Sequence, residues 1–177
     1  MPAAARQGPT PDPAIRFLPS ANAAVVSAHT RAIIRDLLLA SDCRSCWITS
    51  TSRTPADQAR AMYRNIVALG VPAQLALYAD AGDAVIHAYV AARKARLDEA
   101  AILAAMTAKI VAVGPGKVSL HCADPSRLNV VDIAPSSIHD PRAFAAAIAR
   151  ATKAGRLSRF FSPGSHDPAF HIEVPQP

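Results

Sequence analysis

Three residues in the second half of the chain, His121, Asp132 and His171, have side chains that together could bind a metal ion. Each lies in a short apolar run that predicts a separate β-strand. Two imidazoles and one carboxylate make three protein ligands and leave a fourth tetrahedral position open for water. Such a site lowers the pKa of the bound water to about 7, so a nucleophile exists at neutral pH. The sequence therefore predicts a hydrolytic centre with Zn²⁺ as the metal.

Hydrolysis at such a centre also needs a general base and a group that holds the developing oxyanion. Asp167 and Glu173 flank His171, and either could serve as the base. An arginine can hold the oxyanion or a substrate carboxylate. Arg53, which stands just before a well-capped helix, is the candidate for that role.

Each of these residues also has an ordinary structural reading. A lone histidine on a strand is more often a hydrogen-bonded structural residue than a ligand. Asp132 could cap a turn before Pro135, and Arg53 could pair with an acid on the surface. The metal-site hypothesis therefore depends on all of these residues occurring together.

Periodicity predicts the elements that must position the candidate residues. Helices are expected at about 21–40, from the N-cap Thr54 to Gly70, twice within 72–112 with a break near 93–97, and from Asp140 to Ala154. Strands are expected at 46–49, 117–121, 129–133, 157–161 and 169–174. Helices come first and strands gather late. We therefore expect an α+β fold in which helices pack on one side of a small antiparallel sheet that carries the metal site.

The length of 177 residues fits one domain with a proper core. Residues 1–20 are rich in proline and predict an extended arm, and residues 21–177 are expected to form a single domain. The helical stretch at about 72–112 is expected to be an insertion that covers the cleft or offers a surface to a partner.

Three blocks of sequence resemble a known family. The segment ITSTSRTPADQARAMY has Ser50, Arg53 and Gln58 at matching places, and it is followed in order by SLH with NVVDI and by AFHIEV. This ordered set, over most of residues 46–174, resembles the zinc D-Ala-D-Ala carboxypeptidase and hedgehog-like peptidase family. The resemblance implies zinc on His121, Asp132 and His171. It also implies that Arg53, Gln58, Ser50 and Ser119 lie around the substrate, with Ser119 contacting either the substrate or a metal ligand.

The family acts on the stem peptides of peptidoglycan as carboxypeptidases or endopeptidases, and its phage members are endolysins. Two features of this chain depart from the family pattern. The residues between His121 and Asp132, CADPSRLNVV, form a longer segment than usual and contain no glycine, which leaves Asp124 as an alternative ligand. Pro168 occupies the usual place of the base, so Asp167 is the expected base and Glu173 the alternate.

The charge of the chain bears on its partners. The net charge of +6 implies attraction to a polyanion, but the basic residues are scattered and no nucleic-acid-binding motif is present. We therefore expect peptidoglycan, not nucleic acid, as the partner of a monomeric protein. The alternatives are a non-catalytic module on the same fold that binds cell wall or protein, and a basic nucleic-acid-binding protein.

No charged and apolar segment typical of a secretory signal begins the sequence, and no apolar run is long enough to span a bilayer. The expectation is a protein made in the cytoplasm that reaches the cell wall by phage lysis or by a secretion apparatus.

The cysteines Cys43, Cys46 and Cys122 are too few for a disulfide framework. The C-x-x-C spacing of the first two could be a redox motif, but no thioredoxin-like pattern surrounds it. We expect these two residues to be small packing residues near a strand. Cys122 beside His121 could be a nucleophile, although adjacent side chains on a strand point to opposite faces.

Overall fold

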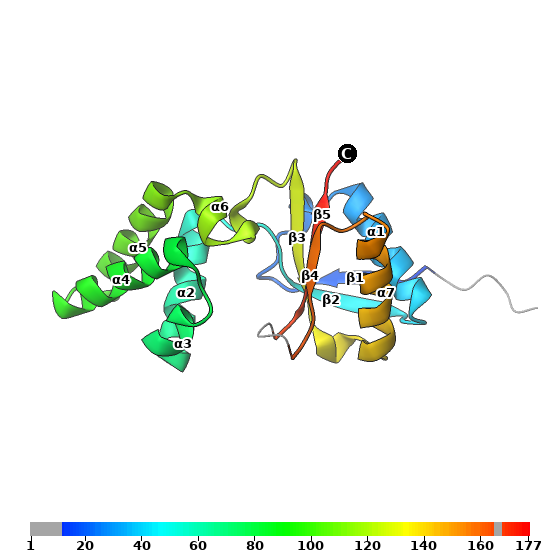
Figure 1. Cartoon of the computed structure of the whole chain (residues 1–177), viewed down its shortest axis with the longest axis horizontal. Helices are drawn as coiled ribbons and strands as arrows, with labels where there is room; N and C mark the ends of the chain where they lie inside the picture. Colours follow the sequence, from blue (N-terminus) through cyan, green and yellow to red (C-terminus); the bar gives the residue numbers. More distant parts are fainter. Residues whose placement is uncertain (1–11, 165–167) are drawn as a thin grey trace, which may run out of the picture.

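The computed structural model describes residues 12–164 and 168–177. It shows an α+β fold built on one mixed sheet of five strands in the order β1-β2-β3-β5-β4 (Figure 1). The strands are β1 (Ala14–Phe17), β2 (Ser45–Ser50), β3 (Leu128–Ile133), β4 (Arg159–Phe161) and β5 (Phe170–Pro175). The α+β class expected from the sequence is confirmed.

Seven α-helices accompany the sheet in the described parts of the chain. They are α1 (Ala28–Ala40), α2 (Pro55–Leu69), α3 (Val71–Leu75), α4 (Asp80–Lys94), α5 (Glu99–Val113), α6 (Pro115–Val118) and α7 (Pro141–Lys153). Short 3-10 turns η1 (Ala23–Val25), η2 (Leu120–Cys122) and η3 (Pro135–Ser137) lie between them. Over the residues described, no helix combines the length and the apolar character needed to cross a membrane.

The sequence led us to expect an antiparallel sheet, but the sheet is mixed. Strand β1 runs parallel to β2, whereas the other pairs are antiparallel. The chain between β1 and β2 forms helix α1, and a crossover helix returns the chain to the end at which the first strand began. The last part of the Pro-rich segment 1–20 thus belongs to the sheet through β1. Residues 1–11 of that segment lie outside the described residues.

One face of the sheet packs on helices α1 and α7 and forms the main core (Figure 1). Alternate residues of β5 point into this core, namely Phe170, Ile172 and Val174. The ring of Phe144 on α7 meets that of Phe170 edge to face, with centroids 5.1 Å apart. Because side chains alternate along a strand, the other residues of β5 must point to the opposite face.

Helices α2 to α6 form a second packed unit beside the sheet (Figure 1). Its core contains Met62 of α2, Val85 and Ile86 of α4, and Met106 of α5. Helix α2 and Val118 of α6 belong to this core, so the unit is larger than the helical stretch expected at 72–112. The chain leaves the sheet for this unit after Ser50 and returns to the sheet before Leu128.

The strand expected at 117–121 is absent. Pro115 begins a helical turn that ends at Val118, and Leu120–Cys122 is a 3-10 turn capped by Ser119. Strand β3 already has β2 on one edge and β5 on the other, so no edge beside it remains for another strand. His121 therefore reaches the sheet from a turn.

Helix α2 begins with the capping box that its sequence predicts. The Thr54 hydroxyl accepts a hydrogen bond from the Asp57 backbone N–H, and the Asp57 carboxylate accepts one from the Thr54 backbone N–H. We expect Thr54→Ala to lower the free energy of unfolding by about 0.5–2 kcal/mol, the usual cost of losing an N-cap. Denaturant unfolding followed by circular dichroism measures this change.

Thr107→Ala is the matched control, because that hydroxyl only bonds the Leu103 carbonyl in the middle of α5. It should change stability little. The difference between wild type and Thr54→Ala should also shrink in acid. The hydrogen bond from Thr54 lowers the pKa of Asp57, so the contribution of this carboxylate is present above its usual pKa of about 3.9 and is lost as the pH falls further. An equal loss in both variants would contradict the capping role.

Candidate metal centre

The sheet face opposite the main core carries a row of functional side chains. Asp132 of β3 lies directly opposite His171 of β5 in the antiparallel register. On the other side of β3, Asp132 is paired with Ser50, the last residue of β2, and His171 is paired with Phe161 of β4. Neighbouring strands thus place these side chains next to one another on one face.

His121 completes the group from the turn η2, at the place where the chain returns from the helical unit. The backbone N–H of Arg53 donates to the His121 carbonyl at 2.7 Å. The imidazole Nδ1 lies 2.8 Å from the carbonyl oxygen of Thr51. Two bonds to the segment after β2 therefore fix the His121 main chain and ring against the sheet.

The three predicted ligands meet. His121 Nε2 lies 3.1 Å from Asp132 Oδ2, and His171 Nδ1 lies 2.9 Å from Asp132 Oδ1. One ligand atom from each residue falls within 4.8 Å of the others, so the group could hold a metal ion. Both histidines are buried, and their rings meet edge to face, with an interplanar angle of 78° and centroids 5.2 Å apart.

The Asp132 carboxylate is held in its charged form. Burial works against the charge, but hydrogen bonds from His121 and His171 hold the pKa of Asp132 well below its usual range. A carboxylate that remains ionised while largely enclosed is suited to binding a cation.

The ring nitrogen of each histidine that points away from Asp132 has its own partner, an arrangement that suits a bound cation. Nδ1 of His121 can only donate to the Thr51 carbonyl, which leaves Nε2 of the neutral ring as a lone pair facing Asp132. Nε2 of His171 lies 3.3 Å from Glu173 Oε1, and in the tautomer with the proton on Nε2 the Nδ1 lone pair faces Asp132. The ring atoms that face Asp132 either donate a hydrogen bond to it or, as lone pairs, can bind a cation together with the carboxylate. The donor set therefore fits a divalent metal ion.

Arg53 lies beside the candidate metal ligands, and Ser50 and Gln58, which the sequence predicted with it, hold its side chain. Its Nε and one terminal nitrogen donate to Ser50 Oγ at 3.1 and 2.7 Å, and its other terminal nitrogen donates to Gln58 Oε1 at 3.1 Å. It also lies 3.8 Å from Asp132 Oδ2. The Gln58 amide nitrogen donates to the hydroxyl of Tyr78, at 3.2 Å. A chain of hydrogen bonds therefore links the helical unit to the guanidinium.

Two candidate residues, Ser119 and Asp124, lie in turns outside the group of three side chains. Ser119 Oγ accepts a hydrogen bond from the His121 backbone N–H at 3.3 Å, so Ser119 shapes the turn that carries this ligand. Asp124, the alternative ligand, is exposed, and its carboxylate accepts from the Ser126 backbone N–H. The structure joins Asp132, not Asp124, to the two histidines.

The two candidate bases differ in what the structure shows of them. Asp167 lies outside the described residues. Glu173 is buried and contacts His171 on the ring nitrogen that faces away from Asp132. That contact is typical of a carboxylate that orients a metal-binding histidine and increases its basicity.

The variant Glu173→Gln distinguishes these two roles for Glu173. If Glu173 orients His171, the variant should bind metal about 10–100-fold more weakly, the usual effect of losing such a partner. Competition with a chelating dye measures this affinity, and circular dichroism checks that the fold is intact. Unchanged metal affinity together with a large loss of kcat would instead make Glu173 the general base.

Sequence reasoning missed three residues around the centre. Thr51 contributes only its carbonyl, which leaves no signal in the side-chain pattern. Tyr78 reaches Gln58 from the helical unit, and Phe161 places its ring 5.5 Å from that of His171. The predicted pairing of strands around His171 could have pointed to Phe161, whereas the contact of Tyr78 depends on how the helices pack.

The cysteines do not contribute to the centre. Cys43 and Cys46 are free, buried and part of the main core, which confirms their role in packing. Burial raises the pKa of Cys46 to about 12 and that of Cys122 to about 11. Such thiols remain protonated at neutral pH and are poor nucleophiles.

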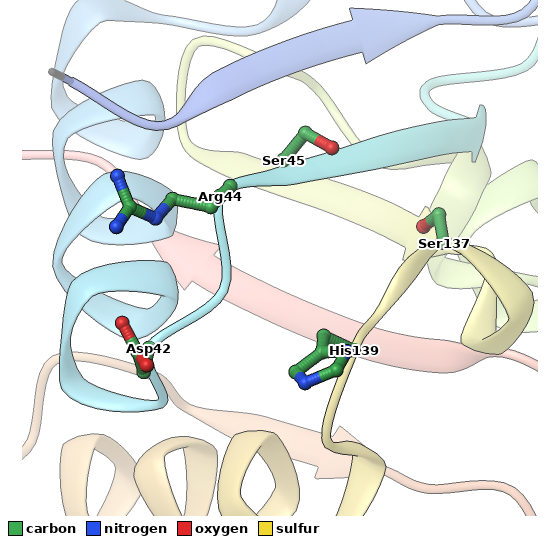
Figure 2. A pocket seen from close by; sticks show the side chains of 5 residues that line it. All are labelled: Asp42, Arg44, Ser45, Ser137 and His139. Carbon is green, nitrogen blue, oxygen red and sulfur yellow. The ribbon is translucent and has the colours of Figure 1, made fainter.

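A separate hollow of about 420 Å³ lies at the other end of β2 and shares no residue with the metal ligands. Figure 2 shows that its five labelled side chains stand apart from one another and do not meet at a common point. They are Asp42, Arg44, Ser45, Ser137 and His139. Within residues 12–164 and 168–177, the group of side chains that could hold a metal is His121, Asp132 and His171.

Comparisons with protein-family models, with curated protein sequences and with solved structures find no match to this chain.

Proposed function

We propose that this chain is a zinc-dependent peptidase that hydrolyses amide bonds in the stem peptides of peptidoglycan. The observation that carries the proposal is the meeting of His121, Asp132 and His171, with the far ring nitrogen of each histidine held by an acceptor. The three motif blocks that resemble the zinc D-Ala-D-Ala carboxypeptidase and hedgehog-like peptidases supply the same three residues. Chemistry and resemblance thus support one set of ligands.

The donor set favours zinc. Imidazole suits zinc, copper, iron and nickel, whereas magnesium and calcium prefer sites made of oxygen alone. Three protein ligands with one open position are typical of catalytic zinc. When bound in such a site, zinc supplies a water of lowered pKa and polarises a substrate carbonyl.

The residues around the centre have separate proposed roles. Asp167 is the proposed base that takes the proton of the attacking water. Glu173 and the Thr51 carbonyl fix the ring orientation of the two histidines. The side chains of Ser50 and Gln58 hold Arg53 beside the ligands.

Arg53 is the proposed group that binds the carbonyl oxygen or a carboxylate of the substrate. Described residues accept three of its five guanidinium N–H bonds, which leaves donors for a ligand. A donor aimed at the place where negative charge develops stabilises the transition state more than the ground state.

Digestion of purified peptidoglycan tests the proposal. The zinc-loaded protein should release peptide fragments, a chelator should stop the release, and added zinc should restore it. Mass spectrometry of the fragments identifies the bond that is cut. Binding to peptidoglycan without any cleavage, even with zinc, would instead indicate a non-catalytic wall-binding module.

A further inference from the structure

Another cavity lies next to the candidate metal centre. Its volume is about 370 Å³, and Ser50 and Arg53 form the wall that it shares with the centre. Another wall is the segment after β1, where Ser20 Oγ donates to the Thr49 carbonyl at 3.0 Å and the Asn22 backbone N–H donates to Thr51 Oγ1 at 2.9 Å. A substrate that passes Arg53 therefore enters a preformed space.

The lining of this cavity is polar. Hydroxyl, amide, carboxylate and guanidinium groups surround it, and Ala61 is the one aliphatic side chain among the residues that line it. An apolar group would gain little there, because it would bury polar groups without giving them partners. The ligand of this cavity must therefore be polar.

The charged side chains that line the cavity favour an anionic ligand. Arg60 and Arg64 stand one turn apart on helix α2, so both can reach the same ligand. Arg60 is paired with Asp57, whereas Arg64 is exposed and has no carboxylate within ion-pair distance among the residues described. With Arg53 on the shared wall, positive charge outweighs the single acid, Asp57.

We propose that Arg60 and Arg64 bind a second carboxylate of the substrate peptide while its scissile amide lies at the metal centre. This inference rests on the proposed peptidase function and extends it to the choice of substrate. The planar guanidinium matches a carboxylate in two parallel hydrogen bonds. Stem peptides of bacterial walls carry such a group, the α-carboxylate of their D-glutamyl residue, which is ionised at neutral pH.

Calorimetric titration with a matched pair of peptides tests this cavity. The probes are Ala-γ-D-Glu-Lys-D-Ala with a free glutamyl carboxylate and the same peptide with that group as a carboxamide. The zinc-loaded protein should bind the acid about 10–100-fold more tightly, as expected for hydrogen bonds between charged groups. The preference should weaken as salt is added.

Arg64→Gln should remove most of this preference, and Arg60→Gln with Arg64→Gln should bring the ratio of affinities close to one. Arg150→Gln, the same change at an exposed position on α7, is the control and should leave the ratio unchanged. Equal affinity of the wild type for the two peptides, or a preference that survives the double variant, would overturn the proposal.

Mass spectrometry of the titrated samples separates this inference from the proposed function. Cleavage of both peptides without any preference would contradict the proposed carboxylate site but not the proposed peptidase activity. Preferential binding of the acid without cleavage of peptide or of peptidoglycan would support the proposed carboxylate site and contradict the proposed peptidase activity.

Discussion

Replacing His121 with alanine is expected to weaken zinc binding by about two to three orders of magnitude and to abolish the hydrolysis of peptidoglycan. The apparent free energy of a structural zinc site, roughly 10–16 kcal/mol over four ligands, amounts to about 2.5–4 kcal/mol for each ligand. His171→Ala and Asp132→Asn should have effects of the same size, because all three residues contribute to one group. Dye competition measures the affinity, and release of soluble peptides measures the activity.

His139→Ala is the control for these variants. His139 is exposed and lies in the separate hollow at the other end of β2 (Figure 2). The control should bind zinc and cleave peptidoglycan like the wild type. A His121→Ala protein that is folded and still hydrolyses peptidoglycan at the wild-type rate would contradict the role of this residue.

The variant Arg53→Ala is expected to lower kcat about 10²–10³-fold, the usual loss when one donor to a developing oxyanion is removed. Zinc stoichiometry should not change, because Arg53 lies 3.8 Å from Asp132 and donates mainly to Ser50 and Gln58. Arg53→Lys should restore only part of the rate, since an ammonium group keeps the charge but not the planar fork. Steady-state kinetics on a soluble stem peptide measures these effects.

Tyr78→Phe provides a graded comparison for Arg53. The variant removes only the hydroxyl that accepts from Gln58, so the guanidinium keeps both bonds to Ser50. Loss of one such neutral hydrogen bond should change kcat less than about tenfold. A larger loss of kcat in Tyr78→Phe than in Arg53→Ala would contradict a role of Tyr78 that acts through Gln58 on Arg53.

Local sequence signals predicted the elements that depend on them. Thr54, Pro55 and Asp57 start a helix because cap, ring and carboxylate all satisfy the first turn, and the structure begins α2 at that point. Asp140 likewise caps α7. The grouping of His121, Asp132 and His171 was expected from the ordered sequence blocks and from the chemistry of two imidazoles with a carboxylate, and the structure brings the three side chains together.

Features that depend on distant contacts were not predictable in the same way. The run Val118-Ser119-Leu120-His121 has the apolar content of a strand, yet it forms turns, and the neighbours of β3 in the sheet are β2 and β5. The parallel pairing of β1 follows from the packing of α1 on the sheet. The choice of Asp132 over Asp124 required the strand register that sets Asp132 against His171.

X-ray absorption at the zinc edge of the purified protein is the most direct test of the proposed centre. One zinc per chain is expected, with only nitrogen and oxygen neighbours at about 2.0–2.2 Å and an imidazole signal that corresponds to two rings. That signal should disappear in His121→Ala. A sulfur neighbour at about 2.3 Å, which would assign the metal to the cysteines, or the lack of stoichiometric zinc binding would contradict the account.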